Sequence, residues 1–423
     1  MKNSKAVVGS LVLIFLASIL FTGFTVSAET NVEFWTWALS PTYDDYINNM
    51  VEEFESQHPD VDVTWNDQPW TEMEKKLQAV VASGDAPDVV NMNPTISVNY
   101  AQRGLLVNLD KALKGETINK YFRGPWDASR AAGNSYGFPW YLSTTVTFYN
   151  TELMEEAGIK EPPSNWEELF EVSKKVKEET GKFGFAPHLT GSDLFLRLMS
   201  QYGVRLYNDS ETKAMFNSEA GGEFLSMFVE AYEKGWIPKD SININHREAI
   251  QKYASGQAAV QFTGPQLLRL IKDQNKEVYN KTKVTKSLVG AQKNYNVSVM
   301  NVVVFEKEDK EKQEAAVELA KFVTNGDNQL TLAKKAGVFP SVKEAARAEY
   351  FTEAGETLES KAISTASEQL WESFVAAPLV PNYSQIKQRM HQAVQEALLG
   401  KKSPQKALDD AAEKVTELLN EEE

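Results

Sequence analysis

The sequence contains no cysteine and only four histidines among its 423 residues. Without cysteine the chain has no disulfide, no cysteine-ligated zinc or iron–sulfur site, and no thiol nucleophile. The histidines are scattered, and no two of them have the spacing of a zinc-binding pair; they are His58, His188, His246 and His391. The sequence therefore predicts neither a metal site nor a cofactor.

Positive charge is scarce as well. The chain has 44 lysines and arginines against 59 aspartates and glutamates, which gives a formal net charge of −15. Because an acidic chain repels phosphate backbones, we do not expect nucleic acid as a partner. The length, together with 42% hydrophobic and 24% charged residues, is typical of a globular chain of two or three domain-sized units.

The amino terminus has the three regions of a secretory signal peptide. Lys2 and Lys5 precede an apolar stretch at 6–26, and small residues up to Ala28 suit a cleavage site. This pattern predicts a signal peptide over 1–28. A retained anchor is the alternative, because about 20 apolar residues are enough to span a bilayer. No cysteine follows the stretch, so we expect an exported, periplasmic protein without a lipid anchor or a second membrane span.

Beyond the signal segment, strand and helix patterns alternate. Aromatic and β-branched runs predict strands at 32–37, 61–65 and 88–92, and apolar residues at helical spacing predict helices at 42–58 and 71–83. This order implies parallel pairing through right-handed crossovers, and therefore a doubly wound α/β sheet. Later strand and helix patterns predict a second α/β unit, with a helical carboxyl-terminal tail and no flexible linker.

Aromatic, amide and acidic residues stand where the predicted strands of the first unit end. They are Trp37, Trp65, Asp67, Gln68, Asn91 and Asn93. Ligands of such sheets bind beyond the carboxyl ends of the strands. A pyranose has apolar C–H faces and equatorial hydroxyls, so its site needs aromatic rings and planar carboxylate or amide groups. These strand ends therefore favour a sugar site.

Several short stretches match, in order, the pattern of one family along the whole mature chain. They are ASGDAPDVV (82–90), YAQRGLL (100–106), GFPW (137–140), FYNTEL (148–153) with AGI (157–159), NWEEL (165–169), TGP (263–265), and the segments at 315–324, 381–383 and 399–412. On these residues the chain resembles extracellular solute-binding proteins of the maltose-binding type (family 1). Members of that family are the substrate-binding receptors of ABC sugar importers.

The resemblance implies a two-lobe periplasmic-binding-protein fold of type II. Each lobe is expected to hold a mixed, mostly parallel sheet flanked by helices, with a hinge between the lobes. The implied amino-terminal lobe comprises 29–142 and about 297–345, the carboxyl-terminal lobe comprises 145–290 and about 365–423, and the crossings lie near 141–144, 291–299 and 343–364. Substrate would bind in the cleft between the lobes and close them about the hinge.

The same resemblance adds candidate ligand-binding residues to those at the strand ends. These are Trp140, Tyr141, His188, Asp193, Gly264, Gln266, Tyr295, Asn301 and Trp371. Asn91-Met92-Asn93 lacks the Trp and Asp common in sugar-binding relatives, and Gln266 stands where a stacking Trp usually follows Gly-Pro. Trp166, at a helix boundary, is expected to pack in the core.

The predicted function is the substrate-binding protein of an ABC transporter. It would act as a monomer, capture a mono- or oligosaccharide and deliver it to the membrane permease without catalysis. One alternative is an exported carbohydrate-active enzyme, in which two carboxylates would face each other across the cleft. A receptor for a polyol, glycerol phosphate, polyamine or iron is the other alternative. A phosphate ligand would require Arg or Lys at the strand ends.

Overall fold

A computed structural model describes most of the mature chain. The described residues are 30–113, 115–189, 194–290, 295–353, 355–376, 380 and 382–421. The predicted signal peptide at 1–28 and the candidate Asp193 lie outside these ranges. Within them we find no helix that combines the length and the hydropathy needed to cross a bilayer.

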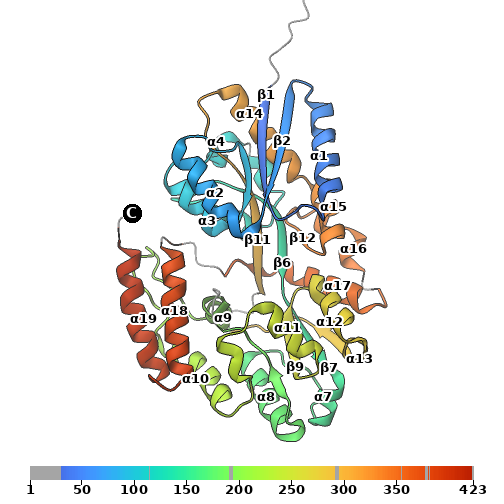
Figure 1. Cartoon of the computed structure of the whole chain (residues 1–423), viewed down its shortest axis with the longest axis vertical. Coiled ribbons are helices and arrows are strands. Elements are labelled where there is room, and N and C mark those ends of the chain that lie inside the picture. Colours follow the sequence, from blue (N-terminus) through green and yellow to red (C-terminus); the bar gives the residue numbers. More distant parts are fainter. Residues whose placement is uncertain are drawn as a thin grey trace, which may run out of the picture.

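The upper half of the molecule in Figure 1, here the upper lobe, is built on a seven-stranded sheet. Its order is β12 (Phe339–Pro340), β6 (Phe138–Thr144), β11 (Tyr295–Val304), β3 (Val89–Met92), β1 (Thr30–Trp37) and β2 (Val61–Gln68), with β13 (Ser373–Phe374) beside β11. β1 pairs in parallel with β2 and β3, whereas β11 runs antiparallel to β3 and β6. The sheet is therefore mixed, because β6 and β11 traverse it in opposite directions.

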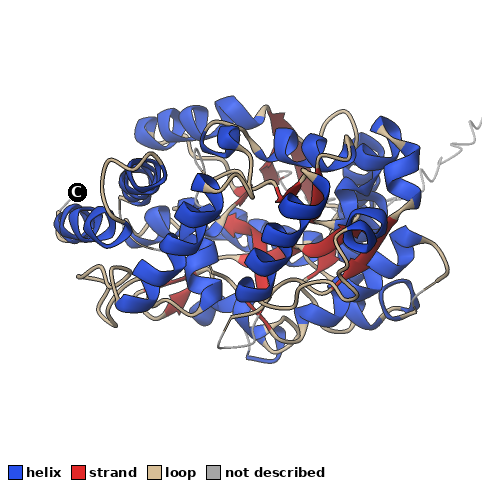
Figure 2. Ribbon diagram, turned by 90° about the horizontal axis from the view of Figure 1, so that it is seen from below, coloured by secondary structure: helices blue, strands red, loops and turns tan. Residues whose placement is uncertain are grey.

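Helices cover both faces of this sheet, so that the strands lie inside and the helices outside (Figure 2). They are α1 (Asp44–Gln57), α2 (Trp70–Ser83), α3 (Pro94–Gln102), α4 (Leu109–Ala112), α5 (Gly115–Ile118), α6 (Arg123–Asp127), α14 (Lys310–Val323), α15 (Gly326–Ala336), α16 (Glu349–Thr352) and α17 (Leu358–Leu370), with a small hairpin of β4 (Arg130–Ala131) and β5 (Asn134–Ser135). In α1, Ile47, Met50 and Phe54 fall at helical spacing and are buried. Amphipathic helices of this kind supply the apolar contacts to the sheet.

The lower lobe holds a four-stranded sheet. Its order is β10 (Thr282–Thr285), β7 (Val146–Asn150), β9 (Ala258–Thr263) and β8 (Phe183–Phe185). Around it lie α7 (Thr151–Glu156), α8 (Trp166–Thr180), α9 (Leu194–Tyr202), α10 (Glu219–Glu233), α11 (His246–Ala254), α12 (Leu268–Gln274), α13 (Lys276–Asn280), α18 (Tyr383–Leu398) and α19 (Pro404–Leu419), with short 3₁₀ turns at Lys239–Ile242 and Pro265–Leu267. A third 3₁₀ turn, Ala345–Arg347, contacts α15, α16 and β12 of the upper lobe. The last two helices pack against α10, so the carboxyl terminus belongs to this lobe (Figure 1).

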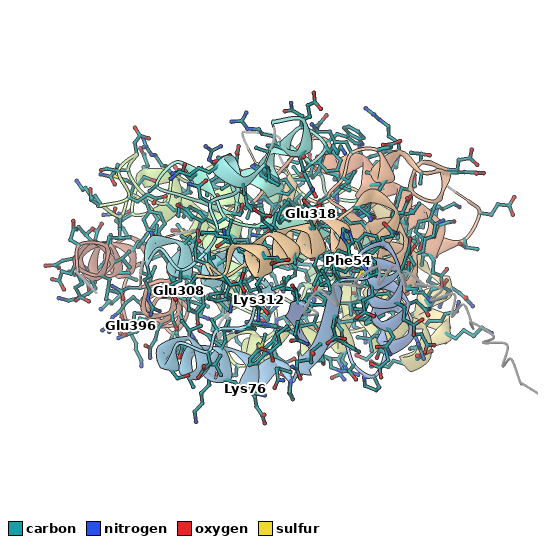
Figure 3. The ribbon with its side chains drawn as sticks, turned by 90° about the horizontal axis from the view of Figure 1, so that it is seen from above. Phe54, Lys76, Glu308, Lys312, Glu318 and Glu396 are labelled. Atoms are coloured by element: carbon teal, nitrogen blue, oxygen red, sulfur yellow. The ribbon has the colours of Figure 1, made fainter. Side chains whose placement is uncertain are left out.

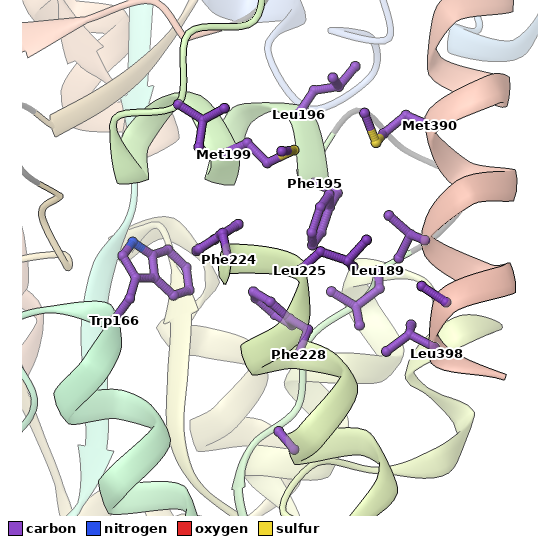
Figure 4. Packing of buried hydrophobic residues seen from close by; sticks show 14 of the residues in the cluster. Trp166, Leu189, Phe195, Leu196, Met199, Phe224, Leu225, Phe228, Met390 and Leu398 are labelled. Carbon is purple, nitrogen blue, oxygen red and sulfur yellow. The ribbon is translucent and has the colours of Figure 1, made fainter. Parts of the chain in front are cut away.

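The core of the lower lobe is rich in aromatic rings. Phe224 and Phe228 of α10 contact the indole of Trp166 with ring centroids 5.3 and 6.1 Å apart. Phe195 of α9 and Met390 of α18 close the same cluster (Figure 4). Because these side chains come from four helices, this cluster fixes α8 and α9, two elements that border the space between the lobes.

Few residues connect the lobes. β6 leads into β7 through the single residue Thr145, and Thr144 donates its hydroxyl to the carbonyl oxygen of Asn296 at 2.9 Å. β11 starts at the lower end of the upper sheet and runs through it to Val304. α17 contacts β6 and β11 of the upper sheet as well as β7 and β10 of the lower one. The connection between the lobes is therefore short and built mainly of extended chain.

A buried carboxylate holds β3 in the upper sheet. Asp88 is 1% exposed and accepts a hydrogen bond from the backbone N–H of Glu33 at 2.7 Å. Lys307, which follows β11, and Lys312 of α14 (Figure 3) place ammonium groups 3.0 and 3.1 Å from its oxygens. One side chain thus joins β1, β3, the end of β11 and α14.

We expect Asp88→Ala to lower the free energy of unfolding by about 3 kcal/mol, because it leaves half-buried ammonium groups and a backbone donor without their partner. The matched control is Asp410→Ala, since Asp410 also pairs with two lysines, Lys402 and Lys406, but at the surface. Exposed pairs contribute little, so the control should unfold at nearly the wild-type urea concentration. Equal losses in the two variants would contradict this role of Asp88.

Candidate functional site

Two adjoining cavities lie where the lobes meet. Their volumes are about 360 and 340 Å³, and both are lined by Ser143, Arg197, Asn296 and Ser298. Because they share these walls, we treat them as one space and call it the interlobe cleft. The larger cavity extends into the lower lobe, and the smaller one is lined by residues that lead into α3 and by β6 and β11 of the upper lobe.

Three aromatic rings form an apolar wall of the larger cavity. Trp166, Phe185 and Phe262 line it, and their ring centroids are 6.1 to 6.2 Å from one another where they touch. Trp166 is the first residue of α8. The helix begins there because the side chain of Asn165 caps it and accepts the backbone N–H of Glu168 at 2.9 Å. The wall therefore comes from α8, β8 and β9.

Polar atoms without a hydrogen-bond partner among the described residues interrupt this apolar wall. They are Nε1 of Trp166, Oε1 of Gln261 and Nδ1 of His246, each on a residue that lines the larger cavity. Trp166 and Gln261 are only 2% and 4% exposed. A buried polar atom left unpaired costs about 1–3 kcal/mol, so such atoms on cavity-lining residues favour binding of a molecule that can pair with them.

The guanidinium of Arg197 lies at the junction of the two cavities, near two histidines. His188 and His246 lie with ring centroids 4.9 Å apart, and Nε2 of His246 is 3.3 Å from the hydroxyl of Thr263. Burial, and then the positive charge of Arg197, lower the pKa of His246. This imidazole is therefore neutral near pH 7, with one hydrogen bond made and Nδ1 left unpaired.

Some of the residues expected from the sequence line the interlobe cleft. Asn93 and Tyr141 border the smaller cavity, and His188, Gly264 and Gln266 border the larger one. Burial raises the pKa of Tyr141, so its phenol stays protonated. The oxygen of the Asn93 side chain already accepts Ile96 N–H and Thr95 O–H, because Asn93 caps α3.

The expected residues at the ends of β1 and β2 line neither cavity. Asp67 accepts the hydroxyl of Thr36 at 2.6 Å and the backbone N–H of Leu39 at 3.0 Å, and therefore holds the turn after β1. Trp65 donates its indole N–H to Thr36 at 2.8 Å, and Gln68 accepts the ammonium of Lys76. Trp65 and Asp67 thus share Thr36 of β1 as a partner, because β1 and β2 pair along their full length, and Gln68 is bound by α2.

Other expected residues lie in the core of the upper lobe. Trp140 is fully buried, with its ring centroid 6.3 Å from that of Phe34, and Trp37 is 4% exposed. Asn91 accepts the backbone N–H of Trp37 at 3.0 Å, and the fully buried Asn301 sits at a register shift in β11. They occupy the core because β3 and β11 are central strands covered on both faces.

The last two expected residues lie near the hinge, outside both cavities. Trp371 is 47% exposed and packs on Phe122 and on the guanidinium of Arg347, 5.0 and 5.1 Å away. Tyr295 begins β11 opposite Ser373. Among the described residues, no group of three His, Cys, Asp or Glu side chains has the geometry of a metal site.

The lowered pKa of His246 has a consequence for stability. Below about pH 6.5, His246 takes up a proton more readily in the unfolded chain than in the folded one. Its contribution to the free energy of unfolding is therefore complete above that pH and is lost as the pH falls further. We expect His246→Gln to reduce this loss between pH 7 and pH 5, as measured by urea unfolding. Burial also lowers the pKa of His391, so the variant should keep the part of the acid-induced loss of stability that comes from His391. An unchanged acid slope in the variant would contradict the assignment.

Comparison with known proteins bears on the identity of the chain. The family model for bacterial extracellular solute-binding proteins matches residues 40–330. One solved structure is a protein of Synechococcus sp. MITs9220 in complex with zinc, provisionally designated an oligosaccharide periplasmic-binding protein. It is 30% identical to this chain, with a TM-score of 0.81, and the match covers 91% of this chain and 98% of that one. The sugar-binding protein MalE of Xanthomonas citri shares the fold, with 23% identity, a TM-score of 0.78 and coverage of 92% and 97%.

A comparison of sequences also finds a binding protein as a relative. The galactooligosaccharide-binding protein of Bacillus subtilis is 27% identical over 87% of this chain and 85% of its own length. The fold is that of the two-lobe periplasmic binding proteins, as expected from the sequence. The chain belongs to the family of bacterial extracellular solute-binding proteins.

Proposed function

We propose that this protein is the substrate-binding protein of an ABC importer, and that it captures a mono- or oligosaccharide in the interlobe cleft and delivers it to the membrane permease. The observation that carries the proposal is the larger cavity, where aromatic rings alternate with buried, unpaired polar atoms. Family membership makes the chain a binding protein, so the alternative of a carbohydrate-active enzyme falls away.

The wall of the larger cavity suits the chemistry of a sugar. The faces of a pyranose are apolar C–H surfaces, and aromatic rings such as those of Trp166 and Phe262 bind them. Hydroxyls both donate and accept hydrogen bonds, so they can satisfy the donor of Trp166 and the acceptor of Gln261. Such a site rejects an analogue that lacks the matching hydroxyl, because the protein atom would stay buried and unpaired.

The arrangement of the lobes supports a closing motion. Residues 29–142 with about 297–345 would move as one lobe, and 145–290 with the final helices α18 and α19 as the other, since β13 pairs with β11 of the upper sheet. A ligand between them touches Asn296 and Ser298 of β11 and the lower-lobe wall together. Contacts made to both lobes favour the closed population, which is the form that a permease would recognise. Secretion through a cleaved signal peptide at 1–28, without a lipid anchor, would place this cycle in the periplasm.

Saccharide binding is tested by titrating a panel of mono- and oligosaccharides. A true ligand should shift tryptophan fluorescence and raise the melting temperature, since a ligand at 100 times its dissociation constant adds about 2.7 kcal/mol to the stability. A polyol, glycerol phosphate or polyamine included in the same panel tests the other receptor classes. If one of those compounds stabilises the protein and no saccharide does, the sugar assignment is wrong.

The role of the Trp166 indole is tested by Trp166→Phe. This variant keeps an aromatic ring in the wall but removes the N–H donor, so we expect about tenfold weaker saccharide binding. The control is Trp126→Phe in the upper lobe, because Trp126 is equally buried but donates its N–H to Ser135 at 2.8 Å. Calorimetric titration should show weaker binding only for Trp166→Phe. Equal affinity in the two variants would remove Trp166 from the site.

A further inference from the structure

We propose, building on the saccharide receptor function, that the captured sugar carries a negatively charged group, a carboxylate or a phosphate, bound beside Arg197 where the two cavities join. Arg197 lines both cavities. Histidines aside, it is the one ionisable cationic or carboxylate side chain among the described residues that line them.

The histidine pair adds donors to the same place. His246 has an unpaired, buried Nδ1 and lies close enough to Arg197 for the guanidinium charge to lower its pKa. An anion placed between the two groups would accept hydrogen bonds from both and would oppose this lowering. Arg197 and His188 each also have an interaction within the protein. A guanidinium has five N–H donors, so it can keep an internal contact and still bind a ligand oxygen.

The upper lobe contributes a partial positive charge from the opposite side. Asn93, Pro94 and Thr95 border the smaller cavity together with Arg197, and they form the first turn of the nine-residue helix α3. The amino terminus of a helix attracts anions through its dipole, and in α3 the dipole is the main contribution, because Pro94 has no N–H and the side chain of Asn93 already accepts the N–H of Ile96. A charged group in the smaller cavity would therefore be attracted by α3 of one lobe and by Arg197 of the other, which favours closure.

Charge-assisted hydrogen bonds of this kind are short in range and about twice as strong as neutral ones. They matter more here than long-range attraction, because the net negative charge of the protein repels an approaching anion. The inference is therefore that an acidic saccharide binds more tightly than its neutral counterpart of the same ring number, and that this preference depends on Arg197.

The test compares matched pairs of ligands by calorimetric titration of the mature protein. Trigalacturonate is set against galactotriose, an oligomer of glucuronate against cellotriose, and galactose 1-phosphate against galactose. We expect the charged member of at least one pair to bind at least tenfold more tightly, with the uronate and phosphate arms distinguishing the two kinds of anion. The preference should largely persist as the salt concentration rises, because close pairs inside the cavity are screened little, and this readout needs no variant.

Variants then assign the preference to Arg197. Arg197→Gln should abolish the preference, measured as the ratio of the affinities for the charged and the neutral member of a pair, whereas Arg197→Lys should keep most of it. The matched control is Arg205→Gln, since Arg205 lies in the same lobe but pairs with Asp209 at the surface. Should Arg197→Gln fail to fold, Arg197→Lys and the salt dependence still decide the question.

The possible results separate this inference from the receptor function on which it rests. If neutral saccharides bind as tightly as the charged ones or more so, the charged-group inference is overturned and the saccharide receptor stands. If the preference survives in Arg197→Gln, the assignment to Arg197 is overturned. If no saccharide binds, neutral or charged, both proposals fall together.

Discussion

The antiparallel pairing of β6 with β11 is the constraint on which the rest of the structure depends. The two strands pair from Thr144 opposite Val297 to Phe138 opposite Val302, and both belong to the upper sheet. β6 then passes into β7 of the lower sheet after one residue. Since the lobes meet at the end of this ladder, the interlobe cleft lies beside the pivot, and a small rotation there moves both of its walls.

The two lobes contribute different chemistry to the cleft. The lower lobe provides the aromatic wall, the unpaired polar atoms and Arg197, while the upper lobe provides the start of α3 and the phenol of Tyr141. Most of the recognition surface thus belongs to the lower lobe, whose core of rings around Phe228 holds α8 and α9 in place. The upper lobe contributes fewer of the lining residues.

The fold could be predicted from the sequence, but much of the site could not. Alternating strand and helix patterns and the ordered family motifs were sufficient for two α/β lobes. Aromatic residues at strand ends were a weaker guide: Trp65 binds its neighbours at the end of the sheet, and Trp140 lies in the core. Trp166 packs in the core as expected, yet it also lines a cavity, which an apolar pattern cannot reveal. His246 carried no local signal, because only the fold brings it next to His188.

The unpaired atoms of the larger cavity imply a trade-off between recognition and rigidity. Replacing Gln261 by leucine, for example, would remove an unsatisfied acceptor and extend the apolar wall, which is a common route to a more stable protein. The natural residue leaves the empty receptor locally frustrated, and a ligand of the right shape relieves that frustration. The residues of the cleft are therefore those that favour binding, and not those that would give maximal stability.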